Sequence, residues 1–307
     1  MPGALEVLRA RLARGGAPPF DDGARLGLAI EGGAMRGVIS AGMVAALEAK
    51  GAGRAFDAVY GSSAGAINGA YFLAGQARLG TRIYYEDINN ARFIDLRRAL
   101  AGRPIVDLGY LLDEVAVRRK PLDTAAVLRS PVPLSVIVTD VEHEVAAVLR
   151  DFPSAAALMS ALRASATMPV VGGPPHLHAD RRFLDASLSE PIPVVAAVAD
   201  GCTHVVVLLT RGGGMRDRAS AFDRWFVAPR LRRVSATLAI RYLDRAGPYG
   251  EMLRTIDTGR VGIAEVSAIR VSDLHISKLE RRADVLRAGA AAGEEAVERA
   301  LSLEDGT

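Results

Sequence analysis

The 307 residues include a single cysteine, Cys202. One thiol cannot form a disulfide within the chain, and it cannot supply the several thiolates of a cysteine-rich metal site. The sequence therefore predicts neither a disulfide-stabilised fold nor a cysteine-rich metal site. We expect no metal and no cofactor. The lack of disulfides is typical of proteins in the cytosol.

Lysine and aromatic residues are scarce as well. Only three of the 38 basic residues are lysines, and aromatic residues make up 5% of the chain. The 38 basic residues face 35 acidic ones, so the net charge is only +3. Nucleic-acid binding normally combines a basic surface with aromatic side chains that stack on bases. We therefore expect no nucleic-acid partner.

Long apolar runs are missing too. The longest nearly uncharged stretches, 64–77 and 191–199, fall short of the roughly 18 to 20 residues that cross a bilayer. At the N-terminus charged residues interrupt the apolar ones, whereas a secretory signal needs an unbroken apolar core. Half of the residues are hydrophobic, which is enough for a folded core. We expect a cytoplasmic protein without a transmembrane helix, and contact with the inner membrane face stays open.

The apolar pattern predicts a leader at 1–24 and a single domain at 25–305. The leader is a short helical stretch that ends in glycines and prolines. Strands are predicted at 26–30, 56–60, 132–139 and 203–210, and the first two lead through glycine-rich turns into helices that reach about residues 50 and 77. Strands that alternate with helices predict a three-layer α/β/α fold with a mainly parallel central sheet. Ligands bind such sheets at the carboxyl ends of the strands.

The other segments are assigned from local signals. Residues 81–130 are predicted as loops and short helices at the edge of the sheet, and residues 212–305 as a mainly helical part. Shorter predicted elements are a hairpin strand at 145–149, a helix at 154–165 capped by Ser154, a strand end at 182–185, a helix within 194–199, a helical stretch at 218–246, a last strand at 260–271 and a terminal helix at 278–303.

The segment Gly61-Ser62-Ser63-Ala64-Gly65 fits Gly-x-Ser-x-Gly. It lies between a predicted strand and an apolar helix, which is the context of a nucleophile elbow. A strained turn there exposes the hydroxyl of Ser63 at a helix N-terminus, whose partial positive charge favours an alkoxide or oxyanion. Glycine at 61 and 65 avoids clashes in the turn. The alternative is an ordinary turn in which Ser62 or Ser63 caps the helix.

A second glycine-rich loop, 32–37, follows the first predicted strand. Its consecutive backbone N–H groups at the start of a helix suit an anion, which predicts an oxyanion hole. A nucleotide phosphate loop and a purely structural turn are the alternatives. The phosphate loop is disfavoured because the residues match neither Gly-x-Gly-x-x-Gly nor a Gly-Lys-Ser/Thr ending.

A nucleophilic serine needs a base, which is most often histidine. The five histidines are His143, His176, His178, His204 and His275. His204 lies at the start of a predicted strand and His275 in a polar loop, which favours structural roles. The spacing of His176 and His178 predicts both rings on one face of a strand. A metal or triad role for this pair is the alternative to an exposed hairpin, which we favour.

Three ordered motifs resemble those of the patatin-like phospholipase family. They are the glycine loop after the first strand, the Gly-x-Ser-x-Gly elbow about thirty residues later, and Phe183-Leu184-Asp185-Ala186-Ser187 leading into 190–193. Residues 135–140 are similar to the family's central strand with a Thr-Asp end, and 164–169 to its Ala-Ser-x-x-x-Pro turn. The resemblance covers residues 26–210 and implies the patatin-like fold.

The resemblance implies a Ser-Asp dyad in which Ser63 is the nucleophile and Asp185 the base. Because aspartate has an ordinary pKa of about 3.9, it is a weak base unless it is buried within hydrogen-bond reach of the serine. The resemblance also implies an oxyanion hole of backbone N–H groups, and residues that support the two loops. The oxyanion residues are Gly32, Gly33 and Ala34, and the supporting residues are Arg36, Gly37, Gly61 and Gly65.

Two positions depart from the family pattern. Ala34 replaces a third glycine, and Ala186 replaces the glycine that usually follows the aspartate. A methyl group at 34 disfavours a positive φ and narrows the oxyanion site, and one at 186 shifts Asp185. Neither change removes a reacting group, so we expect an effect on catalytic efficiency more than on the fold.

We predict a serine acyl hydrolase of the phospholipase A or lysophospholipase type, which cleaves lipid or lysophospholipid esters through an acyl-enzyme. The alternative is a non-hydrolytic lipid-binding or regulatory protein of the same fold, and acyl transfer to an acceptor other than water is a minor variant. Residues 224–226 and 230–233 suit peripheral membrane contact, but a helix that packs its apolar face on the core is the favoured interpretation. The sequence leaves the oligomeric state open.

Overall fold

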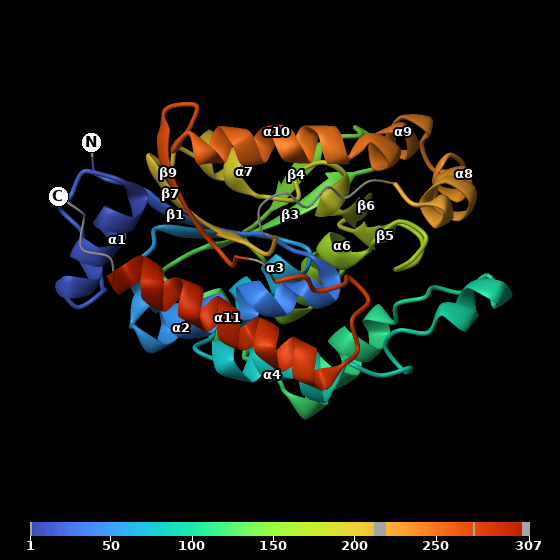
Figure 1. Cartoon of the computed structure of the whole chain (residues 1–307), viewed down its shortest axis with the longest axis horizontal. Helices are drawn as coiled ribbons and strands as arrows, with labels where there is room; N and C mark the ends of the chain where they lie inside the picture. The colour runs from blue at the N-terminus through green and yellow to red at the C-terminus, as the bar shows by residue number, and fades with distance from the viewer. Residues whose placement is uncertain (1, 212–218, 273, 303–307) are drawn as a thin grey trace.

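A mostly parallel sheet forms the middle layer of the computed structural model, which describes residues 2–211, 219–272 and 274–302 (Figure 1). Its parallel strands, in order across the sheet, are β3 (Leu134–Asp140), β2 (Ala58–Ser62), β1 (Leu26–Ile30), β7 (His204–Leu209) and β9 (Ala264–Arg270). Every residue of β1, β2, β3 and β7 is buried. Their continuous apolar runs are typical of parallel strands that are covered on both faces. The predicted fold class is confirmed.

Antiparallel strands extend this sheet. They are β4 (Ala146–Leu149), β5 (His176–His178), β6 (Arg181–Asp185) and β8 (Arg260–Val261). β4 is the hairpin partner of β3, as the sequence predicts. The prediction of one last strand at 260–271 is wrong, because Gly262 adopts a left-handed φ of 58° and turns the chain between β8 and β9.

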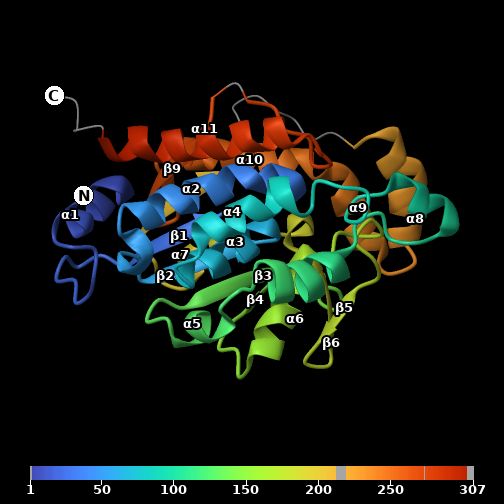
Figure 2. The ribbon, with the colours of Figure 1, turned by 90° about the horizontal axis from the view of Figure 1, so that it is seen from below.

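Helices cover both faces of the sheet (Figures 1 and 2). One face carries α2 (Val38–Ala49), α3 (Ala64–Leu73), α4 (Ala77–Glu86) and α11 (Ala283–Ser302), and the other carries α7 (Val194–Ala199) and α10 (Ala246–Asp257). The single helix predicted to reach residue 77 is divided, because Gly75 has a φ of 69°. α11 begins five residues later than predicted, and residue 303 lies outside the described residues.

The remaining helices range from 3 to 12 residues in length. Ser154 caps α6 (Ala155–Ala166), as predicted, by accepting a hydrogen bond from the backbone N–H of Ala157 at 3.1 Å. Residues 212–218 and 303–305 of the predicted C-terminal part lie outside the described residues. The other helices are η1 (Ala34–Gly37), η2 (Ala52–Arg54), η3 (Leu96–Ala101), η4 (Tyr110–Arg119), α5 (Thr124–Arg129), η5 (Ala186–Leu188), η6 (Asp223–Val227), α8 (Ala228–Leu231) and α9 (Ala236–Asp244). Among all helices in the described residues, none combines the length and the apolar character that crossing a membrane requires.

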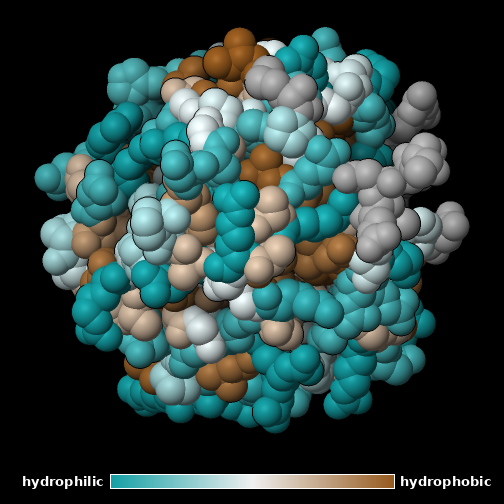
Figure 3. Space-filling model, turned by 90° about the vertical axis from the view of Figure 1, so that its left-hand side faces the viewer, coloured by the Kyte–Doolittle hydropathy of each residue, from teal (hydrophilic) through white to brown (hydrophobic). Residues whose placement is uncertain are grey.

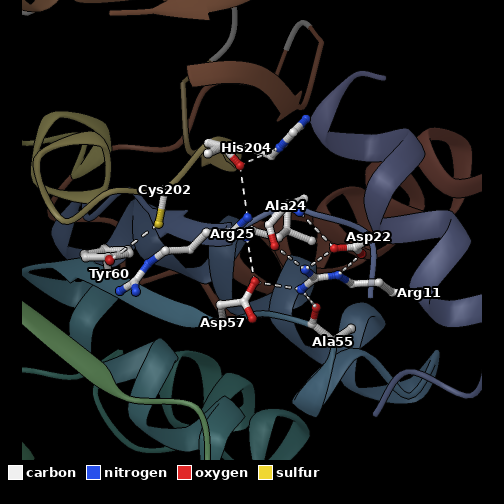
Figure 4. A network of polar contacts seen from close by, with 11 residues as sticks. Arg11, Asp22, Ala24, Arg25, Ala55, Asp57, Tyr60, Cys202 and His204 are labelled. Carbon is white, nitrogen blue, oxygen red and sulfur yellow. Dashed lines mark hydrogen bonds and ion pairs between the residues drawn. The ribbon is translucent and has the colours of Figure 1, made fainter. Parts of the chain in front are cut away.

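The N-terminal helix α1 (Ala4–Ala13) packs against the sheet, and a buried arginine fixes it there (Figure 4). Ala4 and Leu8 belong to the hydrophobic core. The guanidinium of Arg11 donates to Asp22 at 2.7 Å, to Asp57 at 2.8 Å and to two backbone carbonyl oxygens. The leader predicted at 1–24 therefore shares its core with the sheet. The boundary between 1–24 and 25–305 stays a prediction.

Candidate active site

The strands β2 and β6 run in opposite directions, and their ends meet along one edge of β3. Residues 136–139 of β3 all pair with β4 along one edge of β3. Two of these residues also pair with β2 and the other two with β6, so β2 and β6 must both lie along the opposite edge. Ser62 at the end of β2 stands opposite Ile137, and Asp185 at the end of β6 stands opposite the next residue, Val138. This register brings Ser63, which follows β2, next to Asp185.

The turn after β2 holds Ser63 in a strained conformation. Its φ and ψ are 56° and −124°, outside the regions that L-residues favour. A Cβ at Gly61 would collide with the backbone of Ala66, and one at Gly65 with the carbonyl group of Ile30. Ser63 directly precedes α3, and 7% of it is exposed. This is the geometry of a nucleophile elbow.

Ser63 and Asp185 form a direct hydrogen bond. Ser63 Oγ donates to Asp185 Oδ2 at 2.7 Å, and the other carboxylate oxygen accepts the backbone N–H of Ser187 at 2.8 Å. The backbone of Asp185 is fixed as well: its N–H donates to the carbonyl of Thr167, and its carbonyl accepts from the Thr139 hydroxyl, both at 2.8 Å. The carboxylate is thus held in one orientation toward the serine.

Burial changes the proton affinity of the carboxylate. Asp185 is only 1% exposed, and this burial raises its pKa above the ordinary value of an aspartate. Hydrogen bonds from Ser187 and Ser63 and the positive charge of Lys278 oppose the rise. A carboxylate with a raised pKa is a better general base than an exposed one.

The glycine-rich loop lies beside this pair. Gly32, Gly33 and Ala34 line one pocket together with Ser63 and Asp185. Gly33 has a φ of 151°, and Ala34 has a φ of 52°. Within the described residues, the backbone N–H groups of these three loop residues have no hydrogen-bond acceptor. Backbone donors that lack an acceptor and face a pocket are suited to hold an anion.

The comparison with known proteins matches this site. Residues 28–198 fit a family model described as patatin-like phospholipase, and the match includes the elbow, the glycine loop and Asp185. The chain belongs to the patatin-like phospholipase family. The resemblance predicted from three short motifs is thereby confirmed.

A curated relative of this patatin-like chain is "Uncharacterized protein YjjU" of Escherichia coli (strain K12). The two are 28% identical over 193 residues, which cover 62% of the chain and 53% of the relative. The chain therefore spans about half the length of the relative that it matches.

The glycine-rich loop is held by a buried polar network that the sequence did not predict. The side chain of Glu31 accepts the backbone N–H of Thr210 at 2.6 Å and the hydroxyl of Tyr249 at 2.9 Å. Thr210 Oγ1 donates to the carbonyl of Gly32 at 2.8 Å and accepts from Arg36 Nε at 3.3 Å. Arg36 therefore lies where it can support the loop, as the resemblance implies. Thr210 and Tyr249 belong to no motif, because they reach the loop only through the tertiary fold.

The other expected supporting residue of the loop, Gly37, faces α3 and α4. A Cβ there would clash with Ala64 and Tyr84, and its carbonyl accepts the side-chain N–H of Asn68 at 2.9 Å. On the other side of the elbow, the N–H of Ser63 donates to Ser165 Oγ at 2.8 Å. Ser165 lies in the Ala-Ser-x-x-x-Pro segment. The motif therefore marks this residue in the sequence, but it does not indicate that Ser165 contacts the elbow.

Ser63 also lines an apolar pocket of about 50 Å³. It shares Ala34, Ser63 and Met168 with the pocket that Asp185 and the glycine-rich loop line. Its walls come largely from the segment between 67 and 111, in which the sequence predicted only loops and short helices beyond residue 81. The apolar wall residues include Ile67, Ile83, Ile88, Phe93, Leu108 and Leu111.

The two histidines of the predicted pair bond to Ser160 and not to Ser63. His176 and His178 point to one face of the β5–β6 hairpin, where both rings hydrogen-bond to Ser160 Oγ at 2.9 and 3.0 Å. Burial lowers the pKa of both imidazoles. Among the described residues, no three histidine, cysteine or acidic side chains are grouped so that they could hold a metal ion. The hydroxyl of Ser63 bonds to Asp185 instead.

The two departures from the family pattern differ in their backbone. Ala34 is left-handed, which costs an L-residue about 1 kcal/mol. Ala186 begins η5, is fully buried and is not left-handed. Its methyl group leaves the 2.7 Å contact between Ser63 and Asp185 in place.

We expect Ala34→Gly to raise the free energy of unfolding by about 1 kcal/mol, because glycine adopts a positive φ without strain. The matched change Ala186→Gly should lower it by about 1 kcal/mol, because the flexible residue replaces a buried methyl in ordinary backbone. Urea unfolding of both variants measures the two signs. Equal signs would contradict the role assigned to the backbone at Ala34.

Proposed function

We propose that the protein is a serine acyl hydrolase that cleaves lipid esters with Ser63 as the nucleophile and Asp185 as the general base. One observation carries the proposal: the 2.7 Å hydrogen bond from Ser63 Oγ to a buried carboxylate at an elbow turn. Membership of the patatin-like phospholipase family supports it. A cytoplasmic location and a dyad without a cofactor belong to the same proposal.

In the first half of the reaction, Asp185 takes the proton of Ser63 Oγ while this oxygen attacks the ester carbonyl carbon. The carbonyl oxygen becomes an oxyanion and accepts hydrogen bonds from the N–H groups of the 32–34 loop. The intermediate then collapses, the bond to the alcohol breaks, and the leaving alcohol takes the proton from Asp185. An acyl group remains on Ser63.

In the second half, water replaces the alcohol. Asp185 takes a proton from water, the resulting hydroxide attacks the acyl carbon, and the bond to Ser63 Oγ breaks. Ser63 recovers its proton through Asp185, and a carboxylic acid leaves. The dyad and the loop amides supply every group that these steps require.

The apolar pocket supports a lipid or lysophospholipid ester as the substrate. Ser63 lines this pocket, so an acyl chain whose carbonyl carbon lies at Oγ would extend between α3 and the wall formed by Phe93 and Leu108. Burying methylene groups there contributes about 0.8 kcal/mol each. Short polar acyl groups would lack this contribution.

A fluorophosphonate probe tests the nucleophile. We expect stoichiometric labelling, detected by intact mass, with the adduct on Ser63 in the peptide map. The matched control is Ser62→Ala, because the hydroxyl of Ser62 donates to the carbonyl of Glu190 at 2.8 Å instead. Labelling should persist in Ser62→Ala and vanish in Ser63→Ala. No labelling of the folded protein, together with bound lipid found by mass spectrometry, would favour the non-hydrolytic alternative.

A further inference from the structure

Two exposed segments lie side by side at the end of the molecule opposite to both termini (Figures 1 and 2). They are residues 91–104, which include η3, and residues 219–245, which include α8 and α9. One cavity is lined from both sides, by Gly102 and Pro104 and by Arg230, Leu231 and Val234. The two segments therefore border the same cavity, together with residues from 169–175 and Leu184, although more than a hundred residues separate the two segments in sequence.

Bulky apolar side chains project from both segments. Leu100 is 92% exposed and Leu96 61%, while Trp225 is 83% and Phe222 42% exposed. The sequence favours a helix that packs its apolar face on the core, and Leu231 is indeed buried. Trp225 faces solvent instead, so that interpretation is wrong for it. A group of large exposed apolar side chains indicates an interaction site.

The same two segments concentrate positive charge. Residues 91–104 contain four arginines and one aspartate, and residues 219–245 contain six arginines and two aspartates. The two segments thus carry a net charge of +7, against +3 for the whole chain. Three acids outside the segments contact them, because Glu114 pairs with Arg92, Asp107 with Arg98, and Glu144 accepts a hydrogen bond from Ser235. With these acids included, the net charge is still +4. Arg224, Arg232 and Arg233 are exposed and form no ion pair with any residue that the structure describes. The opposite end is mostly hydrophilic, with apolar residues in small separate groups (Figure 3).

The first of these segments adjoins the apolar pocket of the candidate active site. Phe93, in this segment, and Val106 and Leu108, just after it, line the pocket that Ser63 also lines. A partner that contacts residues 91–104 would therefore lie close to the wall of the pocket.

We propose that residues 91–104 and 219–245 form a docking face for an anionic lipid bilayer. Leucine and tryptophan side chains enter the boundary between head groups and acyl chains, and arginines pair with anionic head groups. A symmetric pair of two such faces does not fit, because two positively charged faces repel each other. A polynucleotide fits less well, because stacking successive bases needs several exposed aromatic rings. This face offers only Trp225 and the partly exposed Phe222, and its other large exposed side chains, Leu96 and Leu100, cannot stack on bases.

The test uses the only tryptophan of the chain, Trp225, as a probe. The Ser63→Ala protein is mixed with vesicles of equal parts phosphatidylcholine and phosphatidylglycerol, so that binding is measured without hydrolysis. We expect a blue shift of the tryptophan emission and co-sedimentation with these vesicles, and both should weaken as salt rises. Pure phosphatidylcholine vesicles should give neither.

Variants separate the apolar and the charged contributions. Leu100→Ala should lower the vesicle affinity severalfold, while Ile263→Ala, at a 78% exposed residue in the turn between β8 and β9, should leave it unchanged. Arg232→Gln and Arg233→Gln should each lower it about fivefold. Arg14→Gln, at an exposed arginine after α1, is the matched control. Thermal unfolding followed by circular dichroism checks that each variant is folded.

Three outcomes would overturn the proposal. They are an unshifted emission with anionic vesicles, equal binding to neutral vesicles at any salt concentration, and an equal shift with a single-stranded polynucleotide. The proposal does not rest on the proposed hydrolysis, because binding is read in a protein without Ser63. We expect Leu100→Ala to hydrolyse a soluble short-chain ester at the wild-type rate. Its weaker vesicle binding would then be distinguished from a loss of hydrolytic activity.

Discussion

Replacing Asp185 with asparagine is expected to lower kcat for ester hydrolysis by about a hundredfold to ten-thousandfold, which is the usual contribution of a general base. The carboxylate accepts a hydrogen bond from Ser63 Oγ. The neutral amide cannot take up the proton of Ser63, even though it has the same shape as the carboxylate. Steady-state kinetics with a nitrophenyl ester, together with a thermal unfolding curve, measure the loss and check the fold.

Glu190→Gln is the matched control, because Glu190 is a second buried acid on the same segment. Burial raises the pKa of Glu190 to about 7, and its side chain accepts the backbone N–H of Ala196 at 2.8 Å. A glutamine can keep that hydrogen bond, so kcat should stay within about threefold of the wild-type value. A large loss of kcat in Glu190→Gln, together with normal turnover in Asp185→Asn, would identify Glu190 as the general base.

The pH profile gives an independent reading of the same residue. Only the ionised form of Asp185 can accept a proton, so activity should fall as the pH drops through its raised pKa. This acid limb should lie above the ordinary aspartate value of about 3.9. The acid limb of the pH profile should remain in the Glu190→Gln variant. If it disappeared in that variant, the group that titrates would be Glu190 and not Asp185.

Arg11→Ala is expected to lower the free energy of unfolding by about 3 kcal/mol. The guanidinium is 1% exposed and satisfies two carboxylates and two carbonyl groups, which lose their partner in the variant (Figure 4). Removing one member of a buried ion pair costs about 3 to 5 kcal/mol. The lower end applies because Asp57 is about one third exposed. Urea unfolding at neutral pH measures the change.

Arg25→Ala is the matched control in the same network (Figure 4). Arg25 is half-exposed and pairs with Asp200 at 2.9 Å, and such surface pairs contribute at most about 1 kcal/mol.

The pH dependence of stability gives a second check on Arg11. The hydrogen bond from Arg11 lowers the pKa of Asp22, so this stability is present above the ordinary aspartate pKa and is lost as the pH falls below about 4. In Arg11→Ala that acid dependence should be smaller, and losses of equal size in both variants would contradict a special role for Arg11.

The sequence by itself determined the fold class and the family, because these depend on local patterns. Alternating apolar segments predict a parallel sheet, and three motifs in a fixed order identify the elbow, the loop and the aspartate. The turn at Ser63 could be predicted for the same reason: its conformation depends on glycines within two residues of it.

The tertiary structure alone decided how these pieces meet. Asp185 reaches Ser63 because β6 runs opposite to β2 on the same edge of β3, and strand direction leaves no mark in the local sequence. Thr210 and Tyr249 contact the loop residue Glu31 from about 180 and 220 residues away, and no motif links residues so far apart. The exposure of Trp225 is likewise a tertiary property. An aromatic residue in a basic helical stretch packs on the core or faces water according to what its neighbours cover, and neighbours in space are not neighbours in sequence.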